Sequence, residues 1–102
     1  MVALLEQPDR AALDKVCRQH HVRRLALFGS VARGDARADS DIDLLVDYDP
    51  GEAVTYFDMV DLSDQLHSLF GGARRIDLVT EQSLHRLVRK HVMSDLVVLY
   101  ER

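Results

Sequence analysis

The clearest pattern of hydrophobic and polar positions along the chain lies in the segment DIDLLVDY. Ile42, Leu44 and Val46 alternate there with Asp41 and Asp43, which is typical of a β-strand that buries one face and leaves the other polar. Other runs rich in apolar residues, RRLALF, RRIDLVT and DLVVLYE, also predict strands. The predicted strands therefore cover residues 24–28, 41–48, 74–80 and 95–101. The acids inside the second of them call for an explanation.

Apolar residues at helical spacing predict helices between these strands. The first helix is expected over about residues 10–20, with Asp9 as its cap. The second covers residues 53–70, and the third covers residues 81–92, with Thr80 as its cap. The segment SVARGDA is expected to form a short helix or turn. The apolar set of the second long helix is Val54, Phe57, Met59, Val60, Leu62, Leu66 and Leu69. The alternation predicts an α/β (α+β-like) domain with a small sheet of about four strands flanked by helices. The sheet is expected to be mixed, because the connector after Phe28 is short for a parallel crossover.

Composition narrows the class of protein further. A chain of 102 residues fits one domain, predicted to cover residues 1–102. The net charge of −4 argues against direct binding of nucleic acid, which favours a basic surface. The single cysteine, Cys17, cannot form an internal disulfide and is expected to pack as a small hydrophobic residue. With no leader and no membrane-length apolar run recognised, we predict a cytoplasmic protein that does not enter a membrane.

The alternation in the DIDLLVDY strand predicts that its acids lie together and bind a metal ion. Asp41 and Asp43 project from the same face, where two like charges repel unless a cation lies between them. Hard oxygen ligands suit Mg²⁺, which brings phosphate oxygens with it. Asp77, flanked by apolar residues in RIDLV, would join the other two acids if the two strands are neighbours. Paired metal ions there would clamp the attacking and leaving oxygens of a phosphoryl or nucleotidyl transfer.

The Gly29-Ser30 turn before this strand predicts a phosphate site. A strand that ends in Gly-Ser and enters a helical turn exposes backbone N–H groups, and Gly29 allows phosphate to approach closely. Arg33, one turn later, would add positive charge. Each feature alone is weak, since Asp77 also suits the edge of a sheet and Arg33 also suits a solvated helix. Their combination favours a nucleoside-triphosphate site.

The spacing of the residues does not match the motifs of other metal-binding or catalytic sites. DSDID resembles the start of an EF-hand, but Leu44 stands where glycine is required and Pro50 where glutamate is required. Ser30 is not in G-x-S-x-G, and no P-loop motif is present. The five histidines show no zinc spacing and are expected to face solvent or a partner.

The segment GSVARGDARADSDIDLLV closely resembles the signature of the DNA-polymerase-beta-like nucleotidyltransferase superfamily, and most of all its minimal, MNT-type branch. The resemblance spans about residues 22–100 and implies the nucleotidyltransferase fold. It implies that Gly29 and Ser30 hold the triphosphate and that Asp41 and Asp43 bind Mg²⁺. Asp77 matches the third acid, which in this family binds metal and helps to activate the attacking hydroxyl.

The resemblance also implies a reaction and a partner. Members of this family pass AMP from ATP to a hydroxyl group and release pyrophosphate. Short members commonly act as antitoxins of HEPN-type toxins in type VII-like pairs, by AMP transfer to a toxin tyrosine, by direct binding, or by both. A hetero-oligomer with such a toxin is therefore expected. A neighbouring gene that encodes a short, all-helical protein with an Arg-x4–6-His motif would favour this role.

Two alternatives remain open. One is a non-catalytic antitoxin that binds its toxin through apolar surface on the 53–70 helix or the last helix. The other is transfer to a small molecule such as an aminoglycoside, against which the absence of an acceptor domain counts. Glycosyl transfer is disfavoured because it needs a far larger fold.

Overall fold

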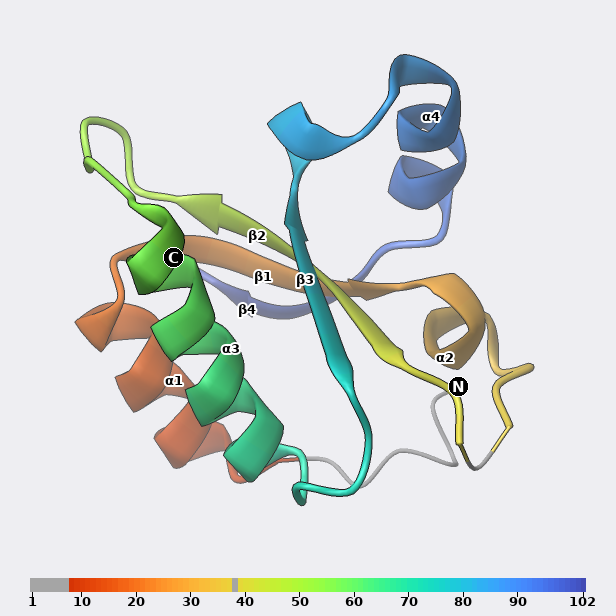
Figure 1. Ribbon diagram of the computed structural model, residues 1–102, viewed down its shortest axis with the longest axis horizontal. Coiled ribbons are helices and arrows are strands. Elements are labelled where there is room, and N and C mark those ends of the chain that lie inside the picture. Colours follow the sequence, from red (N-terminus) through yellow and green to blue (C-terminus); the bar gives the residue numbers. More distant parts are fainter. Residues whose placement is uncertain (1–7, 38) are drawn as a thin grey trace.

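A four-stranded mixed sheet forms the centre of the protein (Figure 1). The structure is a computed structural model that describes residues 8–37 and 39–102. The strands are β1 (Val22–Phe28), β2 (Ile42–Tyr48), β3 (Ile76–Thr80) and β4 (Val97–Glu101), arranged in the order β3-β2-β1-β4. β1 runs antiparallel to β2 and β4, whereas β2 and β3 are parallel. The prediction of a small mixed sheet is therefore confirmed.

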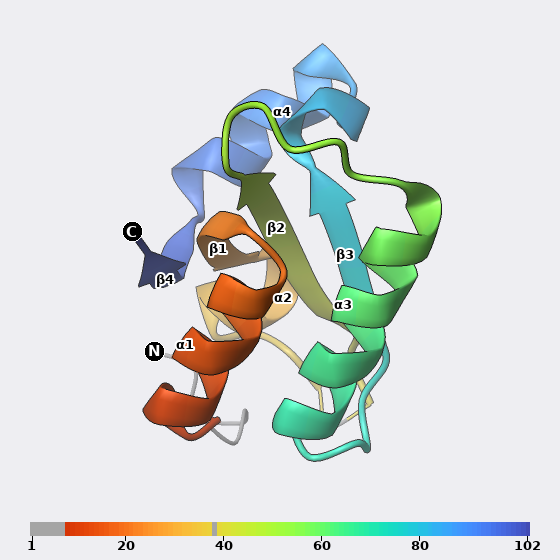
Figure 2. The ribbon, with the colours of Figure 1, turned by 90° about the vertical axis from the view of Figure 1, so that its left-hand side faces the viewer.

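The helices divide between the two faces of this sheet. They are α1 (Arg10–Gln19), α2 (Gly29–Arg33), α3 (Tyr56–Leu69) and α4 (Arg86–Ser94). α1 and α3 lie side by side over one face, and Figure 2 shows α2 and α4 behind the sheet on the other side. The core fills the space below α1 and α3, where Ile42, Leu44 and Val46 of β2 are buried. The polar face of β2 therefore points away from the main core, as the alternation predicted.

The helix starts follow from specific caps. Asp9 accepts a hydrogen bond from the backbone of Ala12, which fixes the predicted start of α1. α3 begins at Tyr56, later than predicted, because Thr55 and Asp58 form a capping box. The backbone N–H of Asp58 donates to Thr55 Oγ1 at 3.2 Å, and that of Thr55 donates to Asp58 Oδ2 at 2.8 Å.

The predicted continuous helix over residues 81–92 is wrong. Thr80 caps only a 3₁₀ turn, Glu81–Ser83, by accepting from the backbone of Ser83. Leu84 and His85 then adopt extended backbone, with ψ of 133° and 140°. His85 starts α4 by accepting from the N–H of Leu87, so two local caps compete and the segment forms two helical pieces.

The apolar stripe predicted for α3 is also partly wrong. Leu62 and Leu66 are fully buried, but Phe57 is 81% exposed and Val60 is 39% exposed. At 100° per residue, Phe57 lies roughly 140° around the helix from Leu62 and so cannot reach the same core. The start of α3 therefore presents apolar surface to solvent.

Cys17 packs in the core, as predicted. The side chain is completely buried, and burial, reinforced by the nearby Asp14 carboxylate, raises the pKa of its thiol to about 12. The thiol is therefore protonated and unreactive at neutral pH.

Within the described residues, every helix is too short or too polar to cross a membrane.

Candidate functional site

Two of the three candidate acids, Asp43 and Asp77, come together at the sheet face opposite α1 and α3, and Asp41 lies near them. β2 and β3 are neighbours, and their register places Asp43 directly beside Asp77. In a parallel pair, residues at the same register project from the same face, so both carboxylates lie on the polar face. Asp41 lies just before β2 and is exposed. Asp43 is half-buried, so it is the most enclosed of the three.

Gly29 lies against the Asp43 carboxylate. Its neighbour Phe28 is paired with Asp43 across the β1–β2 ladder, which brings the end of β1 to the start of β2. A Cβ atom placed on Gly29 would lie 2.3 Å from Asp43 Oδ2, so only glycine leaves room for that carboxylate. Gly29 also has φ of +75°, which L-residues rarely adopt. The Gly-Ser turn and the acids thus occupy one location.

Ser30 follows at the start of α2. The turn before it carries no side-chain cap, because Phe28 at the cap position makes no such hydrogen bond. The first N–H groups of α2 thus lack the side-chain acceptor that satisfies the starts of α1 and α3. Because α2 is only one short turn, any anion held here would be bound by local N–H groups and hydroxyl rather than by a helix dipole.

The acids perturb each other's protonation. Burial is the largest of the effects that raise the pKa of Asp43 to about 6. The negative charges of Asp77 and Asp41 and a hydrogen bond with the Asp77 carboxyl act in the same direction. Arg33 acts in the opposite sense and lowers the pKa of Asp43. The ionised form of Asp43 is consequently destabilised at neutral pH, and a bound cation would stabilise it.

This raised pKa predicts how the stability of the metal-free protein depends on pH. Asp43 ionises at about 6 when folded against an ordinary value of 3.8, so its most favourable contribution is present below pH 3.8 and is lost as the pH rises through 6. Because Asp43 is partly exposed, the loss is expected to be about 1 kcal/mol or less. Asp43→Asn should unfold at higher urea concentration than the wild type at pH 7.5 in EDTA, and at a similar one near pH 3. Parallel stabilities across this range would contradict the prediction.

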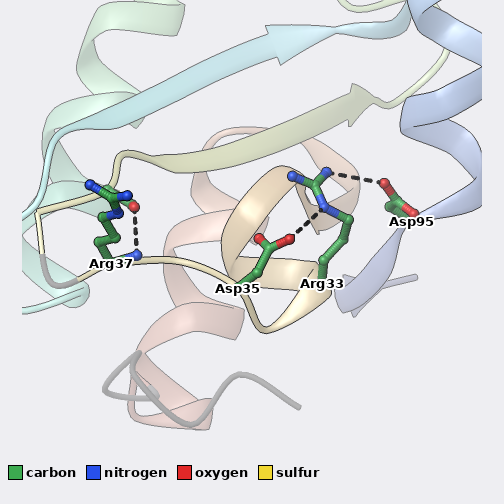
Figure 3. Close-up of polar contacts among 5 residues, drawn as sticks. Arg33, Asp35, Arg37 and Asp95 are labelled. Carbon is green, nitrogen blue, oxygen red and sulfur yellow. Dashed lines mark hydrogen bonds and ion pairs between the residues drawn. The ribbon is translucent and has the colours of Figure 1, made fainter.

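Arg33 is held by two carboxylates at the edge of the site (Figure 3). Its Nε donates to Asp35 Oδ2 and its Nη1 to Asp95 Oδ2, both at 3.3 Å. These hydrogen bonds raise the pKa of the guanidinium, which is in any case always charged. Asp95 directly follows α4, so Arg33 links α2 to α4. Its predicted contact with phosphate remains a prediction, and phosphate would have to compete with these partners.

The donor chemistry of the acids fits Mg²⁺ bound together with phosphate. Within residues 8–37 and 39–102, no three His, Cys, Asp or Glu side chains converge as a ready cage for a metal ion. Mg²⁺ does not need such a cage, because it usually takes one or two carboxylates and completes its shell with water and substrate phosphate. Asp43 and Asp77 supply two adjacent hard oxygen donors, and Asp41 lies close enough to raise the pKa of Asp43.

Two features of the site were not predicted from the sequence. One is Asp95, which is 62 positions from Arg33 and has no motif around it. The other is a pocket of about 250 Å³ between α3 and β3, to which Asp77 contributes. Tyr56 and Phe57, adjacent aromatic residues in a polar helix start, were the available signal for this surface.

Comparison with known proteins identifies the family. Residues 12–102 match the polymerase beta nucleotidyltransferase family. The chain is 38% identical to protein adenylyltransferase MntA of Thermococcus cleftensis over 76 residues, covering 74% of this chain and 73% of the relative. It is also 34% identical to a provisionally named protein adenylyltransferase of Methanocaldococcus jannaschii, with 78% of each chain covered. The chain therefore belongs to the polymerase beta nucleotidyltransferase family and is a nucleotidyltransferase.

Solved structures agree with this assignment. A provisionally described minimal nucleotidyltransferase is 40% identical, covers 86% of both chains and superposes with a TM-score of 0.70. A toxin–antitoxin complex with AMP-PNP contains a chain with the same fold, with a TM-score of 0.70 at 22% identity over 92% of this chain and 74% of that one. The predicted nucleotidyltransferase fold is thereby confirmed.

Proposed function

We propose that this protein is a Mg²⁺-dependent adenylyltransferase that moves AMP from ATP to a hydroxyl group, a tyrosine, of a HEPN-type toxin and so acts as its antitoxin. The observation that carries the proposal is the placement of Asp43 beside both Asp77 and Gly29. Its support from other proteins is the similarity to a protein adenylyltransferase, MntA, and the shared fold with a solved complex of a HEPN toxin and an MNT antitoxin.

The proposal gives each candidate residue a role. Gly29 and Ser30 hold the triphosphate, and Arg33 adds charge beside it. Mg²⁺, when bound by Asp41, Asp43 and Asp77, supplies charge that neutralises the phosphates.

The chemical step is a substitution at the α-phosphorus. The acceptor oxygen forms a bond to that phosphorus, the bond to the bridging oxygen of the β-phosphate breaks, and pyrophosphate leaves with its electron pair. Asp77 takes the proton of the acceptor hydroxyl, because it is an exposed carboxylate beside the metal-binding acids.

Labelled ATP tests this function directly. The protein, Mg²⁺, ATP labelled at the α-phosphate and the HEPN-type protein encoded beside it should yield label on the HEPN-type protein, located on a tyrosine by mass spectrometry. Omission of Mg²⁺ with EDTA should abolish the label. Absence of label under all conditions, or equal label with and without Mg²⁺, would overturn the proposal.

Direct binding is a second candidate mode of neutralisation, favoured by the exposed apolar start of α3. The Asp41→Ala, Asp43→Ala double variant separates the two modes in cells that produce the toxin. Transfer predicts that the double variant no longer protects these cells although it still binds the toxin. Binding alone predicts undiminished protection.

A further inference from the structure

The start of α3 carries apolar side chains that no described part of the chain covers. Tyr56 is 77% exposed and Phe57 is 81% exposed, and their rings pack edge to face with centroids 6.2 Å apart. Val60, on the next turn, is 39% exposed. Clustered exposed aromatic residues are typical of protein interfaces, where they give large contact area at little entropic cost. We call these residues the aromatic patch.

A groove of about 250 Å³ runs from the aromatic patch to the part of the sheet edge that carries Asp77. It lies between α3 and the edge strand β3. Its lining includes Tyr56, Met59, Val60, Asp64, Asp77 and Leu78. Asp77 therefore belongs both to this groove and to the acid pair with Asp43. The Asp77 carboxylate projects from the other face of the sheet, beside Asp43, so a chain seated in the groove would reach it by passing around the exposed edge of β3.

The charges of the groove define what it would bind. Its lining is mainly apolar, with the exposed Asp64 on α3, the exposed Asp77 at the edge of β3, and no basic side chain among its lining residues. This arrangement complements an apolar side chain next to a lysine or arginine. It disfavours an acidic segment, which would be repelled by the Asp64 carboxylate and by the chain's negative net charge.

We propose that the groove and the aromatic patch are the docking surface for the acceptor protein. An apolar side chain of the acceptor packs on the aromatic patch, and a neighbouring basic side chain pairs with Asp64. The acceptor is thereby held at the edge of β3, around which its hydroxyl reaches the Asp77 carboxylate. The proposal rests on the proposed function for the identity of the partner, the HEPN-type protein.

Matched variants test this surface in a background that cannot transfer AMP. With Asp43→Asn present throughout, the affinity for the HEPN-type protein is measured by calorimetry. Phe57→Ser and Asp64→Lys should each weaken binding at least tenfold. Leu87→Ser makes a similar change at a 69% exposed site on α4, and Asp61→Lys makes the same charge change on α3 beside a different pocket. Both controls should change the dissociation constant less than threefold.

The outcomes separate this proposal from the proposed function. Unchanged affinity of Phe57→Ser and Asp64→Lys overturns the docking surface, even if the wild type transfers AMP. Reduced affinity of these variants supports the surface, even if the wild type transfers no AMP and the proposed function fails. A second copy is the competing occupant. If sedimentation shows a wild-type dimer that Phe57→Ser dissociates while affinity for the HEPN-type protein is unchanged, the proposal is overturned.

Discussion

Replacement of Asp43 with asparagine is expected to lower the rate of AMP transfer on the order of 10³-fold, about 4 kcal/mol of transition-state stabilisation. Asparagine keeps the size of the side chain but removes the negative charge that would bind Mg²⁺. The loss should appear in the turnover rate at saturating ATP and partner, measured with labelled ATP. The same substitution removes a destabilised carboxylate, so the variant should be at least as stable as the wild type at pH 7.5.

Asp47→Asn is the matched control for this experiment. Asp47 lies on the same strand and the same face as Asp43, about 13 Å further along at the usual rise of a strand. It pairs across the ladder with Arg24 and is outside the candidate site. Its replacement should change the rate less than threefold. Similar losses in the two variants would mean that the negative charge of the sheet face as a whole, rather than the acid pair, supports transfer.

Replacement of Gly29 with alanine is expected to have the second large effect. The added Cβ would lie 2.3 Å from Asp43 Oδ2 at a backbone φ of +75°, so it both displaces the carboxylate and strains the chain. We expect a loss of roughly 2 kcal/mol in the free energy of unfolding. The rate of transfer should fall about 100-fold, which corresponds to about 2.7 kcal/mol, because the proposed metal ligand is misplaced. Urea denaturation and the labelled-ATP assay measure these effects.

Gly51→Ala isolates the backbone component of that effect. Gly51 has φ of +87°, but a Cβ there would meet nothing within 4 Å. It should therefore cost only the strain of the left-handed conformation and leave transfer unchanged. A second test combines Gly29→Ala with Asp43→Ala, which shortens the opposing side chain. If Gly29→Ala destabilises this background as much as the wild type, the contact with Asp43 is not the cause.

Much of the fold could be predicted from the sequence because local patterns decide it. The alternation in DIDLLVDY fixes which face of β2 carries Asp43, and the cap at Asp9 fixes the start of α1. The break between Glu81–Ser83 and α4 was missed because Thr80 and His85 both compete as caps within a segment of helical spacing. An apolar surface on the 53–70 helix was one of the alternatives left open, but a count of apolar residues does not resolve their angles around the helix and so did not separate the exposed Phe57 from the buried Leu62.

The candidate site was predictable only in part for a different reason. That Asp43 and Asp77 share a face follows from the strand pattern, but their direct pairing depends on the register of two distant strands. The tie from Arg33 to Asp95 and the close approach of Gly29 to Asp43 are contacts between elements. They depend on how α4 and the β1–β2 ladder sit in space, which no local sequence pattern encodes.

The parallel pairing of β2 with β3 has a consequence for how the site assembles as the chain folds. Gly29, Ser30 and Asp43 all lie in the β1–α2–β2 unit, whose strands are antiparallel and joined by a short connector, so closing it costs little loop entropy. Asp77 arrives only when the longer β2–α3–β3 segment has closed and β3 has taken its place. The proposed nucleotide-binding residues Gly29, Ser30 and Asp43 are therefore expected to come together before Asp77 joins them. A nascent chain that lacks β3 would have the proposed nucleotide-binding residues but not the acid proposed to take the acceptor proton.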